Sequence, residues 1–202
     1  SKLLVLTSQK KSIQAFDDFF FLYPNAHNVK ECINLKYIFA YESAKQINTL
    51  ESYNNFISIY ADAPQKDTVI ILRNEKAFEE SKILNTIAAY DNYIKKYPNS
   101  INYKDAITLR NKLAFDEAKT KNTLEAYDDF IIKYPNADEI NTVKEYSSKL
   151  AFQKAKDINT VESYQDYLNK YPNSIHFNDF VLLRDSLAFE IAKQANTKKA
   201  YK

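Results

Sequence analysis

The sequence of 202 residues contains no Gly, no Met and no Trp, whereas it contains 16 Tyr and 13 Phe. At the average frequency, about 14 glycines would be expected in a chain of this length. Phosphate-binding loops, dinucleotide-binding turns and GxSxG nucleophile elbows all depend on the backbone freedom of Gly. The lack of Gly excludes these sites, and it also excludes hairpin turns of the Asn-Gly type. We therefore expect a helical protein whose turns are made without Gly.

The sequence also lacks an excess of either charge and any long apolar run. Its 28 basic and 26 acidic residues give a formal net charge of +2 and are scattered along the chain. Proteins that bind nucleic acids or anionic membranes have a clustered basic surface, which this pattern does not provide. The apolar runs at 19–22 and 69–72 are far shorter than the ~20 residues of a membrane helix. We expect no nucleic-acid partner and no direct membrane span.

The single cysteine, Cys32, cannot form a disulfide within the chain and does not indicate a redox compartment. The sequence has no initiator Met and no signal-type apolar segment, so a targeting sequence is either absent or already removed. Lys202 lies five residues into a helix that is expected to begin after Thr197. On these grounds we expect residues 1–202 to be a fragment of a longer protein.

A repeat of 37 residues runs through the chain without a gap. Its markers are a Tyr that Pro-Asn follows in four of five periods, an Asn-Thr pair, and an Ala-aromatic pair. The tyrosines are Tyr23, Tyr60, Tyr97, Tyr134 and Tyr171, the asparagines are Asn48, Asn85, Asn122, Asn159 and Asn196, and the alanines are Ala40, Ala77, Ala114, Ala151 and Ala188. Residues 1–202 are therefore expected to form one helical-repeat domain.

Each period predicts a hairpin of a short and a long helix. Apolar residues from Leu124 to Tyr134 recur at spacings of three and four, which indicates one apolar helix face. The short helix would be roughly 16 Å long, and the long helix, of about 20 residues, roughly 30 Å long.

We read Asn122 as the left-handed residue that ends a long helix, and Thr123 as the N-cap of the next helix. At the other joint, Asn99 or Ser100 is expected to cap the long helix that follows Pro98. On this basis Asn122→Gly would be neutral or mildly stabilising, whereas Asn122→Val would cost about 1 kcal/mol or more.

Two aromatic series are expected to be buried and to stack as ladders between neighbouring hairpins. They are Tyr53, Tyr90, Tyr127, Tyr164 and Tyr201, and Phe56, Tyr93, Phe130 and Tyr167. Each fully buried aromatic side chain contributes about 1.5 to 3 kcal/mol, and a single hairpin cannot bury its own faces. The small Ala of each Ala-aromatic pair would keep the helices close. We therefore predict an all-α fold, an α-α superhelix (solenoid) of five 37-residue helical hairpins.

The string Ala126-Tyr127, Phe130-Ile131 and Tyr134-Pro135-Asn136-Ala137 resembles tetratricopeptide-type repeats. Tyr97-Pro98-Asn99-Ser100 with Ala106 is most similar to the variant found in periplasmic outer-membrane assembly lipoproteins. The resemblance implies a periplasmic or cell-envelope location, with the cytoplasm as an open alternative, and a protein or peptide partner such as an outer-membrane complex. The period of 37 residues differs from the family's about 34, and the extra residues are most simply one added turn of the long helix.

Three residues of chemically active types receive structural interpretations. Cys32 occupies a position that holds Val69, Ala106, Val143 or Phe180 in other periods, so we read it as a buried apolar side chain and not as a nucleophile. His27 and His176 are the two histidines, and their spacing of 149 residues is not a whole number of periods. We do not expect them to bind a metal.

Two basic series have a structural interpretation and a functional alternative. The first lies in the last turn of each long helix, where the helix dipole favours a cation, and the alternative is a basic stripe for an acidic partner. It consists of Lys45, Lys82, Lys119, Lys156 and Lys193. The second lies mid-helix and is read as inter-repeat ion pairing or stem packing, with a binding surface as the alternative. It consists of Lys36, Arg73, Arg110 and Arg184, with Ser147 in the remaining period.

Neighbouring carboxylates such as Asp128-Asp129 and Glu79-Glu80 face different directions on a helix and form no catalytic dyad. Without a basic groove, the Tyr series is read as core and not as a stacking platform for nucleic acid. No residue is assigned a catalytic, cofactor-binding or metal-binding role, and the binding face is not specified by the sequence.

We therefore expect a non-catalytic protein-protein interaction scaffold, a component of a bacterial cell-envelope complex for outer-membrane assembly or secretion. The alternative is a regulatory or substrate-recruiting segment of a multidomain enzyme whose catalytic part lies outside this chain.

Overall fold

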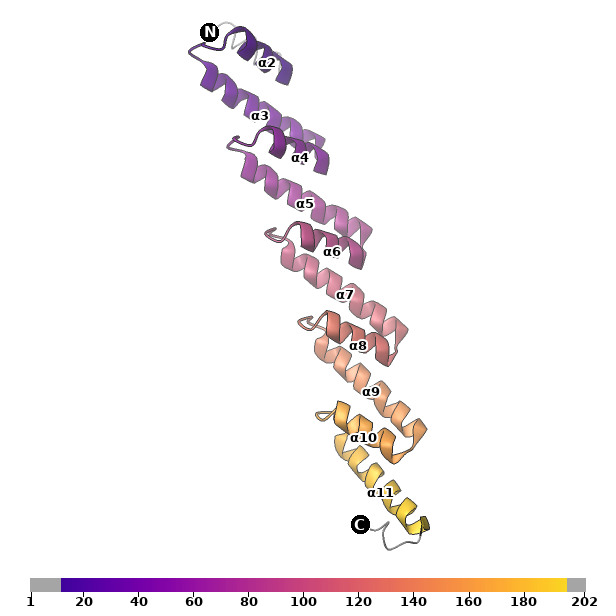
Figure 1. Cartoon of the computed structure of the whole chain (residues 1–202). Helices are drawn as coiled ribbons and strands as arrows, with labels where there is room; N and C mark the ends of the chain where they lie inside the picture. Colours follow the sequence, from indigo (N-terminus) through magenta and orange to yellow (C-terminus); the bar gives the residue numbers. More distant parts are fainter. Residues whose placement is uncertain (1–11, 196–202) are drawn as a thin grey trace. The chain divides into compact units, whose positions relative to one another are not determined.

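The computed structural model describes residues 12–195, and within this range it contains ten α-helices and no strands. Helices of 10 and 19 residues alternate along the chain (Figure 1). The short helices are α2 (Ile13–Leu22), α4 (Leu50–Ile59), α6 (Ile87–Lys96), α8 (Leu124–Lys133) and α10 (Val161–Lys170). The long helices are α3 (Val29–Ile47), α5 (Lys66–Leu84), α7 (Tyr103–Lys121), α9 (Ile140–Ile158) and α11 (Phe177–Ala195). The expected all-α fold class is confirmed.

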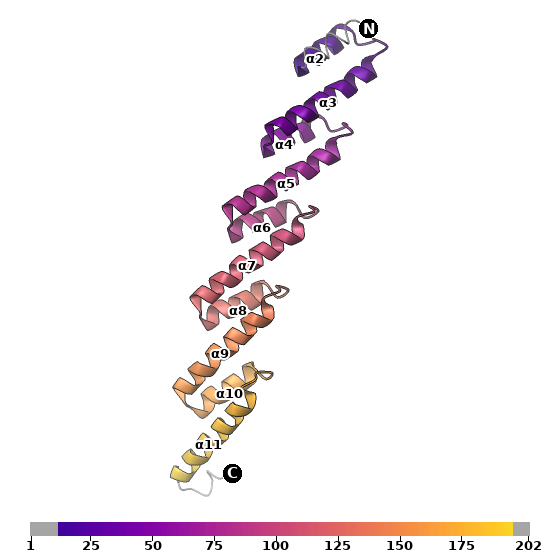
Figure 2. The same cartoon turned by 180° about the vertical axis from the view of Figure 1, so that it is seen from behind.

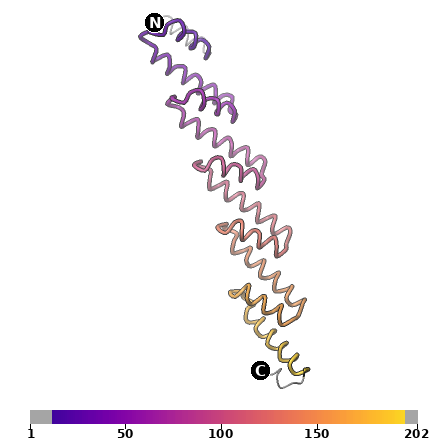
Figure 3. The backbone as a smooth tube through the Cα atoms, viewed as in Figure 1, coloured from indigo at the N-terminus to yellow at the C-terminus, as the bar shows by residue number. Residues whose placement is uncertain are grey.

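The chain divides into two compact units, Ser1–Ile107 and Thr108–Lys202, here called the first and the second unit. In the first unit the consecutive helices from α2 to α6 pack against one another, and in the second unit the same holds for those from α8 to α11. Figures 1 and 2 show α4 between α3 and α5, and α10 between α9 and α11. Within each unit the backbone turns back at every joint, so that consecutive helices run in opposite directions (Figure 3).

A hydroxyl side chain caps the start of each short helix. Thr49, Thr86, Thr123 and Thr160 have extended backbones, and each accepts a hydrogen bond from the backbone N–H three residues later. At α4 and α10 the residue three positions on is Ser, whose Oγ accepts a bond from the N–H of the Thr and completes a capping box. The N-cap role expected of Thr123 is confirmed.

A left-handed Asn ends each of the long helices α3, α5, α7 and α9. The φ angles of Asn48, Asn85, Asn122 and Asn159 are 52°, 45°, 48° and 54°. Each backbone N–H donates to the carbonyl four residues earlier, at distances of 2.9 to 3.0 Å. Asn tolerates this conformation better than other residues with a Cβ. The expected joint is confirmed at these four positions, while Asn196-Thr197 lies outside the described residues.

The side chain of this Asn has a second role that the sequence did not reveal. Its Oδ1 accepts a hydrogen bond from the hydroxyl of a buried Tyr five residues later in the next short helix. The O···O distances are 3.0 Å for Tyr53 to Asn48, 3.4 Å for Tyr90 to Asn85, 2.8 Å for Tyr127 to Asn122 and 2.6 Å for Tyr164 to Asn159. The joint therefore needs both a left-handed backbone and a side-chain acceptor, and Gly supplies only the first.

The other joint differs from the sequence prediction. α7 begins at Tyr103, beyond Asn99 and Ser100, and Ser100 Oγ instead accepts a bond from the N–H of Asn102 at 3.1 Å. The reason is that two consecutive turns follow the short helix, closed by bonds from Ser100 N–H to the Tyr97 carbonyl and from Tyr103 N–H to the Ser100 carbonyl. The N-cap positions of α3, α5 and α9 likewise make no side-chain capping bond. The capping role expected for Asn99 or Ser100 is therefore wrong.

The two aromatic series are buried, but their ring contacts are not those of the expected ladders. Tyr53, Tyr90, Tyr127 and Tyr164 are each at most 3% exposed, and so are Phe56, Tyr93, Phe130 and Tyr167, while Tyr201 lies outside the described residues. The contacts of the second series join a long helix to the short helix that follows it. The pairs are Tyr41–Phe56, Phe78–Tyr93, Phe115–Phe130 and Phe152–Tyr167, with ring centroids 6.4, 5.4, 6.3 and 6.2 Å apart.

The recurring alanines follow the expected burial except in the last described helix. Ala40, Ala77, Ala114 and Ala151 are buried, as close helix packing requires. Ala188 on α11 is exposed, which corrects the expectation for that position. Its neighbours on α11, Leu182 and Ile191, are also exposed.

Asn122→Gly is not expected to be neutral, because it keeps the left-handed turn but removes the acceptor of the Tyr127 hydroxyl. We expect a loss of about 1 kcal/mol in unfolding free energy, and Asn122→Val should cost roughly 1–2 kcal/mol more because its Cβ is branched. Urea unfolding of both variants measures these losses. Tyr127→Phe is the matched background, since Asn122→Gly should cost less in it, and an equal cost in both backgrounds would contradict the bond.

Stability should fall in alkaline solution. Burial raises the pKa of Tyr90 above its ordinary value of 10.0, and burial is also the largest cause of the raised pKa of Tyr53, Tyr60, Tyr93 and Tyr127. Because the folded protein holds these protons more tightly than the unfolded chain, their stabilisation is present below pH of about 10 and is lost above it. The urea midpoint should therefore decrease above that pH, and Tyr90→Phe should make the decrease shallower. A urea midpoint that rose with pH in this range would contradict the expected loss of stability.

Candidate functional site

The recurring lysines occupy the last turns of the long helices, as expected. Lys45, Lys82, Lys119, Lys156 and Lys193 all lie there. Three of them also cover an aromatic ring four residues earlier on the same helix. The Nζ atoms of Lys45, Lys82 and Lys156 lie 5.0, 5.0 and 5.4 Å from the ring centroids of Tyr41, Phe78 and Phe152. These contacts, together with the helix dipole, give the series a structural role.

The mid-helix series meets the Tyr that ends the following short helix. Lys36 Nζ lies 5.8 Å from the ring centroid of Tyr60, and the guanidinium carbons of Arg73 and Arg110 lie 5.2 and 5.0 Å from those of Tyr97 and Tyr134. Ser147, in the next period, replaces this contact by a hydrogen bond of 2.9 Å to the Tyr171 hydroxyl. Lys36 also forms an ion pair with Asp17. Arg184 donates to Gln165 and Asp185 at 2.7 Å. Packing on a Tyr therefore explains most of the series.

Cys32 is fully buried, which confirms its interpretation as a core residue. Burial raises the pKa of its thiol, and the nearby Glu31 carboxylate raises this pKa further. Both effects disfavour the reactive thiolate form.

The carboxylates and histidines do not assemble into a metal cluster in the part of the chain that the structure describes. His27 is exposed in the first unit, and His176 Nδ1 in the second unit lies 3.5 Å from Asp179 Oδ2. Asp128 of α8 accepts a 2.7 Å bond from Lys170 of α10, which raises the pKa of Lys170. In residues 12–195, no helix combines the length and apolar character that a membrane span requires.

A residue pair in each hairpin shows how the core handles buried hydroxyl groups. Where the short helix carries Tyr93 or Tyr167, the residue seven positions later is Ser100 or Ser174, and the two hydroxyls hydrogen-bond each other at 2.5 Å. Where the short helix carries Phe instead, the later residue is Ala. These pairs are Phe19 with Ala26, Phe56 with Ala63, and Phe130 with Ala137. The two positions vary together because an unpaired buried hydroxyl is costly.

A cavity in the second unit has a volume of about 630 Å³. Its base is one face of α9, on which Tyr146, Lys149, Leu150 and Gln153 recur at spacings of three and four. Phe152 of the same helix also lines it. The other lining residues are Lys119 and Asn122 at the end of α7, Tyr127 of α8, and His176 before α11. A second cavity, of about 110 Å³, lies in the first unit, and its lining includes Leu50, Ala77, Tyr93 and Tyr97.

The larger cavity forms where the sequence departs from its own repeat. Tyr146 replaces a Leu, which stands at this position in the other four periods as Leu35, Leu72, Leu109 and Leu183. Gln153 replaces a carboxylate, which is found in the others as Glu42, Glu79, Asp116 and Glu190. His176 stands where the other periods have Asn28, Gln65, Asn102 and Glu139. These departures were visible in the sequence but were not used to predict a site.

Two of the departing residues are fixed by ring contacts. The ring of Tyr146 stacks on Phe115, with centroids 6.3 Å apart and planes at 19°, and it also contacts Tyr127 at 6.1 Å. The imidazole of His176 stacks on Phe152, with centroids 4.1 Å apart and planes at 25°. The cavity thus has aromatic walls whose rings are supported by contacts within the chain.

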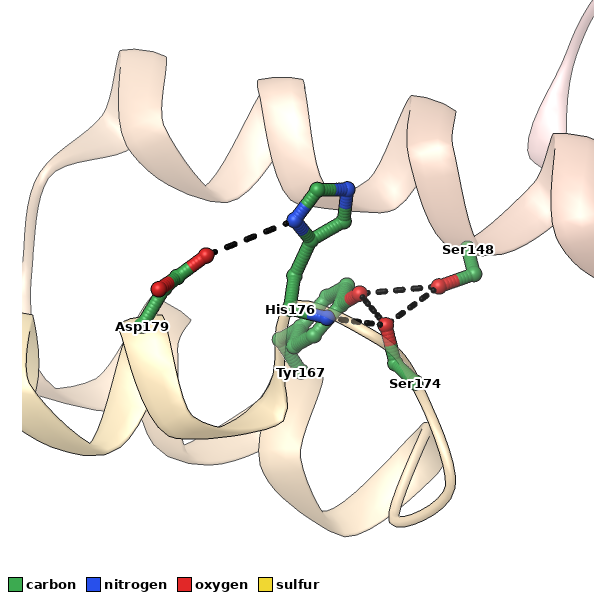
Figure 4. A network of polar contacts seen from close by, with 5 residues as sticks. All are labelled: Ser148, Tyr167, Ser174, His176 and Asp179. Carbon is green, nitrogen blue, oxygen red and sulfur yellow. Dashed lines mark hydrogen bonds and ion pairs between the residues drawn. The ribbon is translucent and has the colours of Figure 1, made fainter.

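A hydroxyl network holds the loop that carries His176 (Figure 4). Ser148 Oγ, Tyr167 Oη and Ser174 Oγ form a triangle with distances of 2.8, 2.5 and 3.0 Å. Ser174 Oγ also accepts a 3.1 Å bond from the backbone N–H of His176. The network joins α9, α10 and the loop before α11, and it fixes the backbone from which the imidazole projects.

Serine, histidine and aspartate meet here without the geometry of a catalytic triad. The serine hydroxyls bond to each other, to Tyr167 and to a backbone N–H, while the imidazole nitrogen Nδ1 faces Asp179 (Figure 4). A triad requires the other imidazole nitrogen to bond the nucleophilic hydroxyl. The described hydrogen bonds instead support a structural role for Ser148 and Ser174.

Comparison of the chain with models of known protein families and with curated proteins gives no match.

The hydroxyl pairing can be tested in the first unit, where Tyr93 and Ser100 are both buried. Ser100→Ala leaves the buried Tyr93 hydroxyl unpaired and should lower the unfolding free energy by about 1–3 kcal/mol. Tyr93→Phe should cost about 1 kcal/mol, because the Ser100 hydroxyl loses the Tyr93 bond and keeps the one from the Asn102 N–H. The double variant should lose less than the sum, since it recreates the Phe–Ala pair of other periods. Chemical denaturation of all four proteins measures the coupling. Additive losses would show that the two hydroxyls do not depend on each other.

Proposed function

We propose that this protein is a non-catalytic protein-protein interaction scaffold in a bacterial cell-envelope complex, such as one for outer-membrane assembly or secretion. Its frame would be a solenoid of five 37-residue helical hairpins related to tetratricopeptide-type repeats. The periodic sequence and the alternating helices of 10 and 19 residues support this frame. The envelope location is supported by the resemblance of Tyr97-Pro98-Asn99-Ser100 with Ala106 to periplasmic outer-membrane assembly lipoproteins.

The observation that carries the proposal is the cavity on α9. The recurring residues are occupied in caps, buried hydrogen bonds and ring contacts, so they maintain the frame. The residues that line the cavity include those that break the repeat, namely Tyr146, Gln153 and His176. Its volume of about 630 Å³ is sufficient for side chains of a partner. A repeat frame with one specialised concave surface is the usual arrangement of repeat proteins that bind other proteins.

The chain in its native context should therefore have a protein neighbour. Crosslinking with mass spectrometry on intact envelopes is expected to give crosslinks between lysines of this chain and a second protein. The full-length gene gives an independent check, because a lipobox cysteine or a peptidoglycan-binding neighbour agrees with the proposal. Crosslinks confined to this chain, together with a monomeric free protein, would contradict it. A catalytic domain in the same polypeptide would favour a recruiting segment of an enzyme instead.

A further inference from the structure

The charge at the cavity differs from that of the same position in the first unit. The cavity is lined by two lysines, Lys119 and Lys149, and no carboxylate belongs to its lining. Two periods earlier, Glu75 and Glu79 stand at the positions of Lys149 and Gln153. At the Lys149 position the other periods have Ile38, Lys112 and Ser186, whereas Gln153 replaces a carboxylate that every other period has. The cavity therefore forms where one recurring negative charge is lost beside two lysines. Such a surface favours an anionic ligand.

The remaining lining adds flat apolar surfaces and a hydrogen-bonding amide. Tyr146 and His176 present rings that are held by Phe115 and Phe152. Gln153 Nε2 donates to Asp157 at 2.8 Å, which orients the amide and leaves its carbonyl oxygen as an acceptor. A peptide backbone N–H is a suitable donor for this oxygen. Rings fixed before binding lose little conformational entropy when a ligand aromatic packs on them.

We propose that the cavity binds a segment of a partner protein that presents an aromatic side chain next to carboxylates. The aromatic side chain packs between the rings of Tyr146 and His176, and the carboxylates pair with Lys119 and Lys149. The amide of Gln153 bonds the backbone of the segment and, unlike a carboxylate, does not repel its charge. This inference rests on the proposed scaffold function and adds the chemistry of the partner.

Peptide binding to the full chain tests the inference. Three labelled peptides of equal length are compared by fluorescence anisotropy, built from Asp and Phe, from Lys and Phe, and from Asp and Ser. The Asp-Phe peptide is expected to bind about tenfold or more tightly than either of the others. Its affinity should also fall as the salt concentration rises, because exposed charge pairs are screened.

Variants that introduce the residues found at the same positions of α5 locate the binding site. Lys149→Glu, Gln153→Glu and Tyr146→Leu introduce residues that the chain itself has at Glu75, Glu79 and Leu72, so the helix should tolerate them. Each is expected to weaken binding of the Asp-Phe peptide by about fivefold or more. Lys112→Glu is the matched control, because it lies one period before Lys149, is exposed, does not line the cavity and changes the net charge equally. It should change the affinity by less than about twofold.

Several results would overturn the inference. Equal binding of the Lys-Phe peptide would exclude charge recognition, and equal effects of Lys149→Glu and Lys112→Glu would indicate attraction by total charge. Phenylacetate that bound as tightly as the Asp-Phe peptide would identify a small aromatic acid as the occupant. If the chain crosslinks to a partner protein but binds none of the peptides, the scaffold function is supported and the cavity is excluded as its binding site. Peptide binding without any crosslinked partner would support the cavity and contradict the scaffold.

Discussion

The hydrogen bond from a buried Tyr to a left-handed Asn is the contact on which the described helices depend. Without Gly, the chain needs another residue that accepts a positive φ at the end of each long helix, and Asn is the best alternative. The same Asn then accepts the hydroxyl of Tyr53, Tyr90, Tyr127 or Tyr164. The turn, the start of the next helix and a polar atom in the core are therefore fixed together by one dipeptide and one Tyr.

This contact explains how the core accommodates many Tyr side chains. A buried Tyr is favourable where its hydroxyl finds a partner, because leaving the hydroxyl unpaired costs about 1–3 kcal/mol. At one position the partner is the Asn of the joint. At another, Tyr93 and Tyr167 have Ser100 and Ser174, and the Phe residues of other periods have Ala. The aromatic content thus follows from local pairing rules that are repeated along the chain.

The sequence predicts the repeated helices and their Asn-Thr joints. It does not predict the side-chain contacts that form across the turns. Helix lengths, the Asn-Thr joints and the buried series follow from short-range propensities and apolar spacing, and the structure agrees with them. The cap expected at Ser100 was wrong because two consecutive turns separate it from α7. The Tyr127 to Asn122 bond and the Arg73 to Tyr97 contact depend on side-chain directions after the chain reverses, which spacing alone does not specify. The cavity does not follow from the recurring pattern, because Tyr146, Gln153 and His176 in its lining depart from that pattern.

In a repeat protein, each position can be compared with the equivalent positions of the other periods. A residue that departs from the repeat can therefore be recognised within a single sequence. Lys119 and Asn122, at the end of α7, recur in every period. Their presence in the lining therefore needs no ligand to explain it. Tyr146, Gln153 and His176 are departures, and the frame does not require them, since Leu, Glu and Asn occupy the same positions elsewhere. These three departures line one cavity, and the repeated frame forms without them in the other periods. The proposed partner segment accounts for all three departures at once, and its carboxylates are complementary to a lining that includes Lys119 and Lys149.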